Sequence, residues 1–223
     1  MRPHKTFDLI IFDCDGVLID SEVISTRTLL ATLGSHGLDV DLGYVQKTYL
    51  GRSISVVKED YLRKVGRALT DSFESDFLER LLAAYRRDLA AMAGIGDLLH
   101  NLSIPYCMAT SSGVERALLS LEVTGLLPFF EGRTFYASMV KHGKPAPDLF
   151  LLAASTLGAK PARCLVLEDS EVGVLAAQNA GMEVWRFVGG SHFKNDDAVS
   201  LDVDAGVPVF ESMEDVAKAL RGS

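Results

Sequence analysis

Short apolar runs recur along this chain and alternate with stretches of helical pattern. Such continuous runs, rich in β-branched residues, are typical of strands that are buried on both faces of a parallel sheet. Helical patterns lie between most of the runs, and this alternation predicts a doubly wound α/β domain. The runs are FDLIIF (7–12), IPYCMAT (104–110), RCLVLED (163–169), MEVWRFV (182–188) and, more weakly, VPVF (207–210).

Helix boundaries in this domain are marked by capping and glycine signals. Ser112 and Glu115 have capping-box spacing, which predicts that a helix begins there and runs to about Leu121. Ser170 is expected to cap the helix EVGVLAAQNAG, which Gly181 closes.

One segment breaks the alternation, because residues 20–87 contain no convincing strand and apolar residues recur every four positions from Phe77 to Tyr85. We therefore expect residues 1–19 and 88–223 to form the sheet domain and residues 20–87 to form a small all-helical insert. Ligands bind at the carboxyl ends of parallel strands, so an insert after the first strand would cover the site as a lid.

Composition limits the classes of partner. The net charge is −8, from 22 basic and 30 acidic side chains, whereas nucleic-acid binders usually carry a basic excess. Small anionic substrates stay possible, because a local metal ion and lysine can override the global sign. The widely spaced Cys14, Cys107 and Cys164 indicate buried thiols in a reducing cytosol. Without a secretory signal or a long apolar segment, we expect a cytoplasmic monomer that has no nucleic-acid or membrane partner.

The residues that can do chemistry all follow predicted strands, at their carboxyl ends, or lie in the loop KHGKPAPD. Parallel strands bring such ends to one edge of a sheet, so several loops would deliver their side chains to one place. The candidates are Asp13, Asp15, Thr110, Ser111, Lys144, Glu168 and Asp169.

These residue types suit the hydrolysis of a phosphate monoester. Asp13 can attack phosphorus and form an aspartyl-phosphate. A hard ion such as Mg²⁺ fits the carboxylates of Asp13 and Asp169 with the backbone carbonyl of Asp15. Lys144 would neutralise the charge of nucleophile and phosphate, and the Thr110 hydroxyl suits phosphoryl oxygens. Asp15, held off the ion, can protonate the leaving oxygen and then deprotonate water.

In this order and spacing, DCDGVLIDSE, the Thr110–Ser111 pair, KPAPDLF and LEDS resemble the four motifs of the haloacid dehalogenase superfamily. More narrowly, they resemble its β-phosphoglucomutase-like and 6-phosphogluconate-phosphatase-like branch. The resemblance covers essentially the whole chain. It implies a Rossmann-like parallel sheet core with an inserted small helical cap domain, Mg²⁺ as cofactor and an aspartyl-phosphate intermediate. We accordingly predict a phosphatase of small phosphorylated metabolites, such as sugar or sugar-acid phosphates.

The resemblance also implies roles for particular residues. Asp13 would be the nucleophile and Asp15 the acid/base, and Asp13, Asp15 and Asp169 would hold the metal ion. Glu168 is expected to brace these ligands from the second shell.

The phosphate would be bound by Thr110, Ser111 and Lys144, although Thr110 could instead be only a strand-end hydroxyl. In the insert, Arg52 of the loop LGRS (50–53) is either a substrate contact or a surface residue. His192 in GGSHF could approach the site, but a plain loop position is the simpler interpretation.

Alternative functions remain at this point. Dehalogenases of this superfamily lack the second aspartate, so Asp15 argues against that activity. A phosphosugar mutase would carry a histidine where this chain has Ser25 and an arginine where it has Ile54. Both differences favour simple hydrolysis over a mutase, and a non-catalytic binding protein on the same fold is the third alternative.

Overall fold

The computed structural model describes residues 6–49, 54–195 and 206–222. The chain divides into two compact units. The larger unit consists of Met1–Asp20 together with Ala90–Ser223, and the smaller unit is Ser21–Leu89. Arg52 lies outside the described residues.

The larger unit is built on one parallel sheet with the strand order β3-β2-β1-β4-β5-β6. This is the strand order of a Rossmann-type doubly wound sheet, so the predicted fold class is confirmed. The strands are β1 (Leu9–Phe12), β2 (Tyr106–Thr110), β3 (Thr134–Tyr136), β4 (Cys164–Glu168), β5 (Glu183–Phe187) and β6 (Val209–Phe210).

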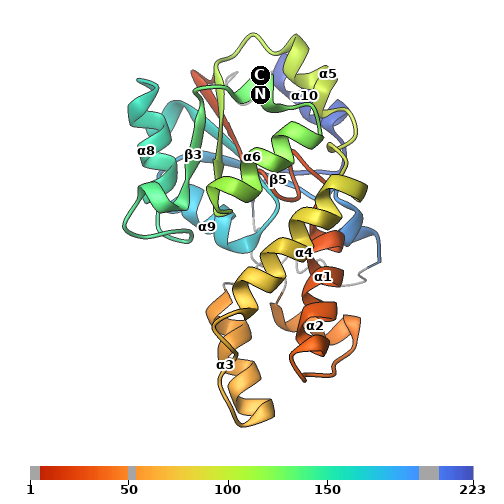
Figure 1. The fold of residues 1–223 in the computed structure, drawn as a ribbon. Coiled ribbons are helices and arrows are strands. Elements are labelled where there is room, and N and C mark those ends of the chain that lie inside the picture. The colour runs from red at the N-terminus through yellow and green to blue at the C-terminus, as the bar shows by residue number, and fades with distance from the viewer. Residues whose placement is uncertain (1–5, 50–53, 196–205, 223) are drawn as a thin grey trace. The chain divides into compact units, whose positions relative to one another are not determined.

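Helices cover both faces of this sheet (Figure 1). Residues of α8 and α9 pack in one apolar cluster with alternate residues of the strands, such as Leu9 and Ile11. On the other face, the Phe12 ring meets those of Tyr106 and Phe130 edge to face. The helices are α5 (Ile95–Asn101), α6 (Val114–Val123), α7 (Leu127–Phe130), α8 (Asp148–Thr156), α9 (Glu171–Asn179) and α10 (Met213–Arg221).

The five apolar runs therefore contain five of these strands, each shorter than its run. The sequence analysis missed β3, since its three residues TFY carry too little pattern to stand out from a loop.

One predicted cap is confirmed and the other is wrong. The Ser170 hydroxyl accepts the backbone N–H of Gly173 at the start of α9. The helix α6, in contrast, begins after Gly113 and has no side-chain cap. The capping-box prediction failed because the Ser112 hydroxyl donates to the carboxylate of Asp15 instead.

The regular secondary structure in the described residues of the smaller unit is all helical, with α1 (Glu22–Ser35), α2 (Leu42–Tyr49), α3 (Ile54–Val65) and α4 (Phe73–Asp88). Its apolar core includes Leu33, Tyr61 and Phe73. The helices α1 and α4 pack against each other.

A buried carboxylate lies inside this helical unit. Asp60 is 3% exposed and accepts hydrogen bonds from the hydroxyls of Tyr44 and Tyr49, at 2.7 and 2.6 Å, and an ion pair from Arg63. Burial raises the pKa of Asp60, but the bonds from Tyr44, Tyr49 and Arg63 outweigh it, so this pKa lies below its usual value. Asp60 is thus a fully partnered structural acid.

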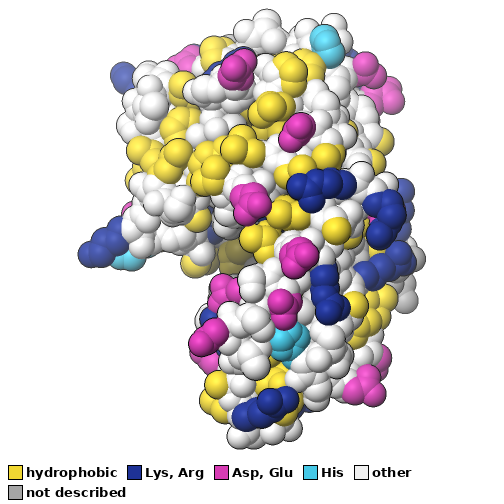
Figure 2. Space-filling view, in the orientation of Figure 1, with side chains coloured by type: hydrophobic (Ala, Val, Ile, Leu, Met, Phe, Trp, Pro, Cys, Tyr) yellow, Lys and Arg dark blue, Asp and Glu magenta, His cyan; other side chains and the backbone are white. Residues whose placement is uncertain are grey.

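On the face drawn in Figure 2, acidic side chains lie among the basic ones, consistent with the chain's overall acidic charge of −8. Among the helices of the described ranges, none combines the length and the apolar character that crossing a membrane requires.

Candidate active site

The site begins where β1 and β4 end side by side. Phe12 pairs with Leu167, and the backbone N–H of Asp13 donates to the carbonyl of Leu167 at 2.9 Å. The strand order runs outward in opposite directions from this pair, and such a switch point leaves a crevice at the carboxyl ends of the strands. The loops after β1 and β4 therefore start next to each other at the place where this fold binds ligands.

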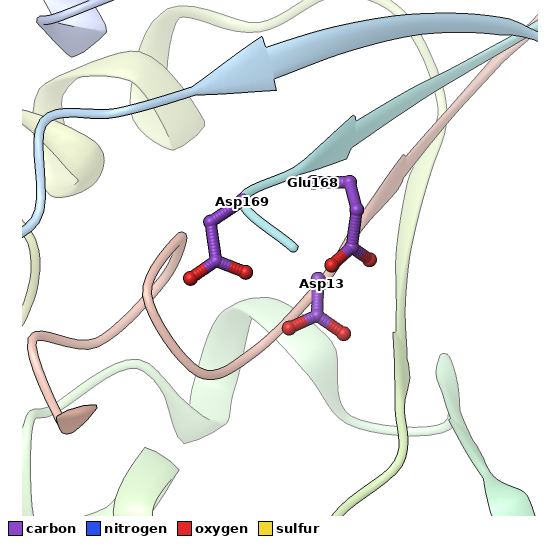
Figure 3. Close-up of side chains that lie close together, drawn as sticks. All are labelled: Asp13, Glu168 and Asp169. Carbon is purple, nitrogen blue, oxygen red and sulfur yellow. The ribbon is translucent and has the colours of Figure 1, made fainter. Parts of the chain in front are cut away.

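Three carboxylates gather at this point. Asp13 follows β1, Glu168 ends β4 and Asp169 follows it, and all three are buried. One oxygen from each lies within 4.8 Å of the others. Figure 3 shows the three side chains converging on one small space.

One lysine faces these acids. Lys144 donates from Nζ to Asp13 Oδ1 and, at 2.7 Å, to Glu168 Oε2, and its side chain is 3% exposed. The one ammonium group thus contacts two of the three buried carboxylates, Asp13 and Glu168. The local charge is uneven, and a buried excess of negative charge is costly unless a cation offsets it.

The same excess of negative charge shifts the pKa values of these side chains. Burial raises the pKa of Asp13 well above its usual value, and the neighbouring charge of Glu168 adds to it, while Lys144 only partly opposes both. Asp169 has a raised pKa for the same reasons. Burial lowers the pKa of Lys144, but Asp13 and Glu168 outweigh it, so that pKa is raised and the ammonium stays charged.

A divalent cation fits this group of acids. The atoms that this group of acids offers to a cation are all carboxylate oxygens, which are the ligands that hard ions such as Mg²⁺ prefer. The close group contains Glu168 beside Asp13 and Asp169, whereas the sequence predicted that Glu168 only braces the metal ligands. Glu168 also accepts hydrogen bonds from the Lys144 ammonium and from both the hydroxyl and the backbone N–H of Ser170, so in this structure it already has three donors.

Two glycines make room for the acids. Gly16 has φ +75°, and a Cβ at this residue would lie 1.9 Å from Asp169 Oδ2. A Cβ at Gly173 in α9 would lie 2.0 Å from Glu168 Cδ. Both carboxylates are therefore packed directly against backbone, which fixes where they can lie.

Asp15 is held differently from Asp13. The Ser112 hydroxyl donates to its Oδ2 at 2.5 Å, and the Arg116 guanidinium pairs with its Oδ1 at 2.6 Å. Sequence reasoning missed Arg116. The only signal was that Arg116, in α6, comes four residues after Ser112, so the two share one side of that segment.

The predicted phosphate-binding residues differ in their surroundings. Thr110 is buried at the end of β2, and its hydroxyl accepts the backbone N–H of Ser112 at 3.0 Å. Ser111 is exposed. Lys144 also lies 3.4 Å from the carbonyl oxygen of Ala109, so the ammonium reaches the end of β2.

The two loop histidines differ. His142 is exposed and pairs with Asp148, as a plain loop residue would. His192 is buried, and its Nε2 lies 3.5 Å from Asp169 Oδ2. The simpler interpretation of His192 as a plain loop position was therefore wrong.

Comparison with known proteins identifies the family. The model of the haloacid dehalogenase-like hydrolases matches residues 7–181, a range that contains all seven described candidate residues. This chain belongs to that family. The resemblance predicted from the four motifs is thereby confirmed.

Several relatives of known name are phosphatases. The chain is 28% identical to the 6-phosphogluconate phosphatase of Escherichia coli, over 84% of this chain and 85% of that protein. It is 30% identical to the phosphorylated carbohydrates phosphatase of Thermotoga maritima, over 96% and 98% of the two chains. A haloacid dehalogenase-like protein of unknown function from Agrobacterium tumefaciens has the same fold, with a TM-score of 0.83, 31% identity and coverage of 97% and 98%.

Proposed function

We propose that this chain is a Mg²⁺-dependent phosphatase that hydrolyses small phosphorylated metabolites, most simply sugar or sugar-acid phosphates. The observation that carries the proposal is the buried group of Asp13, Glu168 and Asp169 at the switch point of the sheet, where Lys144 contacts Asp13 and Glu168. The enzyme class follows from the family and the named relatives: the chain is a phosphoric monoester hydrolase.

In the first chemical step, Asp13 acts as the nucleophile. A carboxylate oxygen of Asp13 forms a bond to phosphorus while the bond from phosphorus to the substrate oxygen breaks. The departing oxygen takes a proton from the carboxyl group of Asp15, so that an alcohol leaves rather than an alkoxide. The products of this step are the alcohol and a phosphorylated Asp13.

In the second step, Asp15 acts as the base. Its carboxylate takes a proton from water while the water oxygen bonds to phosphorus and the bond to Asp13 breaks. This releases inorganic phosphate and restores both aspartates to their starting states.

The remaining residues offset charge and bind the phosphoryl group. Asp13 and Asp169 would hold the metal ion with the backbone carbonyl of Asp15, and a bound Mg²⁺ would offset the charge of the phosphoryl oxygens. Lys144, which already contacts Asp13, adds a fixed positive charge beside the nucleophile. Thr110 and Ser111 supply donors at the end of β2.

A phosphosugar mutase is the second candidate. The position that would carry a histidine in a mutase is Ser25, whose hydroxyl lies 3.1 Å from the Tyr85 hydroxyl inside the helical unit. A serine in that contact cannot act as the titratable group that a histidine provides. Hydrolysis therefore remains the better supported reaction, and a non-catalytic role fits poorly with an intact set of acids.

We further propose the division into a catalytic domain (1–19 and 88–223) and a cap domain (20–87). The cap would select the substrate, with Arg52 as one contact. A cytoplasmic monomer without nucleic-acid or membrane partners fits the acidic charge of the chain.

The test is a panel of sugar, sugar-acid and aryl phosphates, assayed for released phosphate with and without Mg²⁺. Asp13→Asn should lower kcat by a factor on the order of 10³ or more, because an amide cannot form the aspartyl-phosphate. The exposed His100→Asn change, on α5, is the matched control and should leave turnover unchanged. Turnover by Asp13→Asn at the wild-type rate would refute the mechanism, and transfer of phosphate within a bisphosphate-primed sugar would favour the mutase.

A further inference from the structure

The loop that follows β5 is tied to the loop that follows β1. The Ser191 backbone N–H and hydroxyl both donate to Asp20 Oδ1, at 3.0 and 2.9 Å. Because β5 lies beside β4 in the sheet, its loop also emerges at the edge that carries the acids. The segment from Gly190 to His192 is therefore held at the site by two hydrogen bonds.

This segment places one side chain against Asp169. The His192 side chain is 5% exposed, and its Nε2 lies 3.5 Å from Asp169 Oδ2, an ion-pair distance. The ring occupies the space over Gly190, because a Cβ there would lie 2.7 Å from both Cε1 and Nδ1 of His192. The absence of a side chain at Gly190 therefore leaves room for the ring.

The same oxygen of Asp169 is approached from a second side. A Cβ at Gly16 would lie 1.9 Å from Oδ2, so the backbone of the β1 loop packs against this oxygen as well. A carboxylate rotates easily about its Cβ–Cγ bond. Contacts to one of its oxygens from two separate loops restrict that rotation.

We propose that His192 is a positioning residue that holds the carboxylate of Asp169 in the orientation that binds the metal ion. This rests on the proposed function only in taking Asp169 as a metal ligand. An N–H at Nε2 is present both in the charged ring and in one neutral tautomer, so the contact does not depend on titration of the ring. Groups that orient metal ligands in this way typically change metal affinity by a factor of about 10–100.

The test is direct measurement of Mg²⁺ binding by calorimetry, with Mn²⁺ binding by electron paramagnetic resonance as a second probe. His192→Ala should weaken Mg²⁺ binding by a factor of about 10–100. Gly190→Ala should do the same through a different residue, because its new Cβ displaces the ring. In His192→Gln, the side-chain amide can place an N–H near Oδ2, so most of the affinity should return.

The turnover assay separates orientation from general damage. His192→Ala should raise the Mg²⁺ concentration needed for half-maximal turnover, while kcat at saturating Mg²⁺ stays within a few-fold of wild type. His100→Asn is again the control and should bind Mg²⁺ as the wild type does.

Two results would overturn the proposal. Wild-type Mg²⁺ affinity in both His192→Ala and Gly190→Ala would overturn it. Equal losses in the alanine and glutamine variants would also overturn it, since packing alone would then explain the effect. If His192→Ala does not fold, Gly190→Ala and His192→Gln still decide. Wild-type protein that binds Mg²⁺ but hydrolyses no phosphate ester would contradict the proposed function and leave this inference standing.

Discussion

Both units of this protein contain buried carboxylates, but the surroundings of these carboxylates shift their pKa values in opposite directions. In the helical unit, Asp60 is surrounded by Tyr44, Tyr49 and Arg63, and its pKa is lowered. In the sheet unit, Asp13 and Asp169 lie beside another acid, and their pKa values are raised.

The difference separates a structural acid from a functional one. A buried carboxylate with enough donors stabilises the fold and needs nothing more. Buried carboxylates that outnumber the positive charges beside them lower the stability of the metal-free protein, and such under-neutralised groups cluster at functional sites. We infer that the sheet unit keeps its imbalance because a cation completes it.

The largest expected effect comes from removing a metal ligand. Asp169→Asn should lower turnover by a factor on the order of 10³ and weaken Mg²⁺ binding, because the ion loses a charged ligand. Asp60→Asn is the matched change in the other unit and should leave Mg²⁺ affinity unchanged. Calorimetry and a phosphate-release assay on the two variants measure both effects, and equal Mg²⁺ affinity in the two would break the comparison.

The next effect is on stability, measured by urea denaturation in the presence of EDTA. Asp60→Asn should lower the free energy of unfolding by about 2 kcal/mol, because three donors lose a charged acceptor. Asp169→Asn should raise it by about 1 kcal/mol, because one unit of excess buried charge is removed. We therefore expect the change in the free energy of unfolding to have opposite signs in the two variants. Destabilisation of similar size in both would contradict the account.

A smaller effect is expected at Asp15. Like Asp60, this acid is paired with a hydroxyl and an arginine, and like Asp13 it lies in the loop after β1. Arg116→Met should lower kcat for alkyl phosphates about tenfold, since the general acid loses a charged partner that orients it. Aryl phosphates, whose leaving group needs less protonation, should be affected less. The ratio of the two rates in wild type and variant is the measurement, and an equal loss on both substrates would argue against a link to the acid.

The smallest effect is the pH dependence of stability without metal. The pKa values of Asp13 and Asp169 are raised in the folded state, so the folded protein binds more protons than the unfolded one. Stability from these groups is then present at low pH and lost as pH rises through the folded pKa values, by at most about 1.4 kcal/mol per group and pH unit. Asp60 has the opposite sign, because its pKa is lowered and its contribution is lost as pH falls through that value.

Urea denaturation in EDTA between pH 5 and about pH 8 checks the sign. The stability advantage of Asp169→Asn over wild type should grow as pH rises, and saturating Mg²⁺ should reverse it. An advantage that shrinks with rising pH would show that Asp169 is neutralised by its protein neighbours alone.

The sequence predicted those features that depend on regular patterns. Apolar runs marked the buried strands, and parallel strands necessarily bring their carboxyl ends to one edge, so the convergence of Asp13 and Asp169 followed from topology. Lys144 was placed there by the resemblance of KPAPDLF to a family motif. The three-residue strand β3 escaped notice because it is too short to have a period.

Side-chain partners were harder to predict. Local spacing suggested that Ser112 caps a helix, but it cannot reveal a competing carboxylate at Asp15, 97 positions away in the chain. Arg116 and His192 left only weak signals for the same reason, since their partners Asp15 and Asp169 come from distant segments.

The central claim is that Asp13 and Asp169 share one metal ion beside a phosphorylated Asp13. Crystals grown with Mn²⁺ and a phosphoryl mimic such as trifluoroberyllate, with anomalous diffraction at the manganese edge, test this directly. We predict one strong anomalous peak in contact with carboxylate oxygens of both Asp13 and Asp169, and the mimic bonded to Asp13. A peak that contacts only one of the two aspartates, or a mimic bound to another residue, would contradict the account.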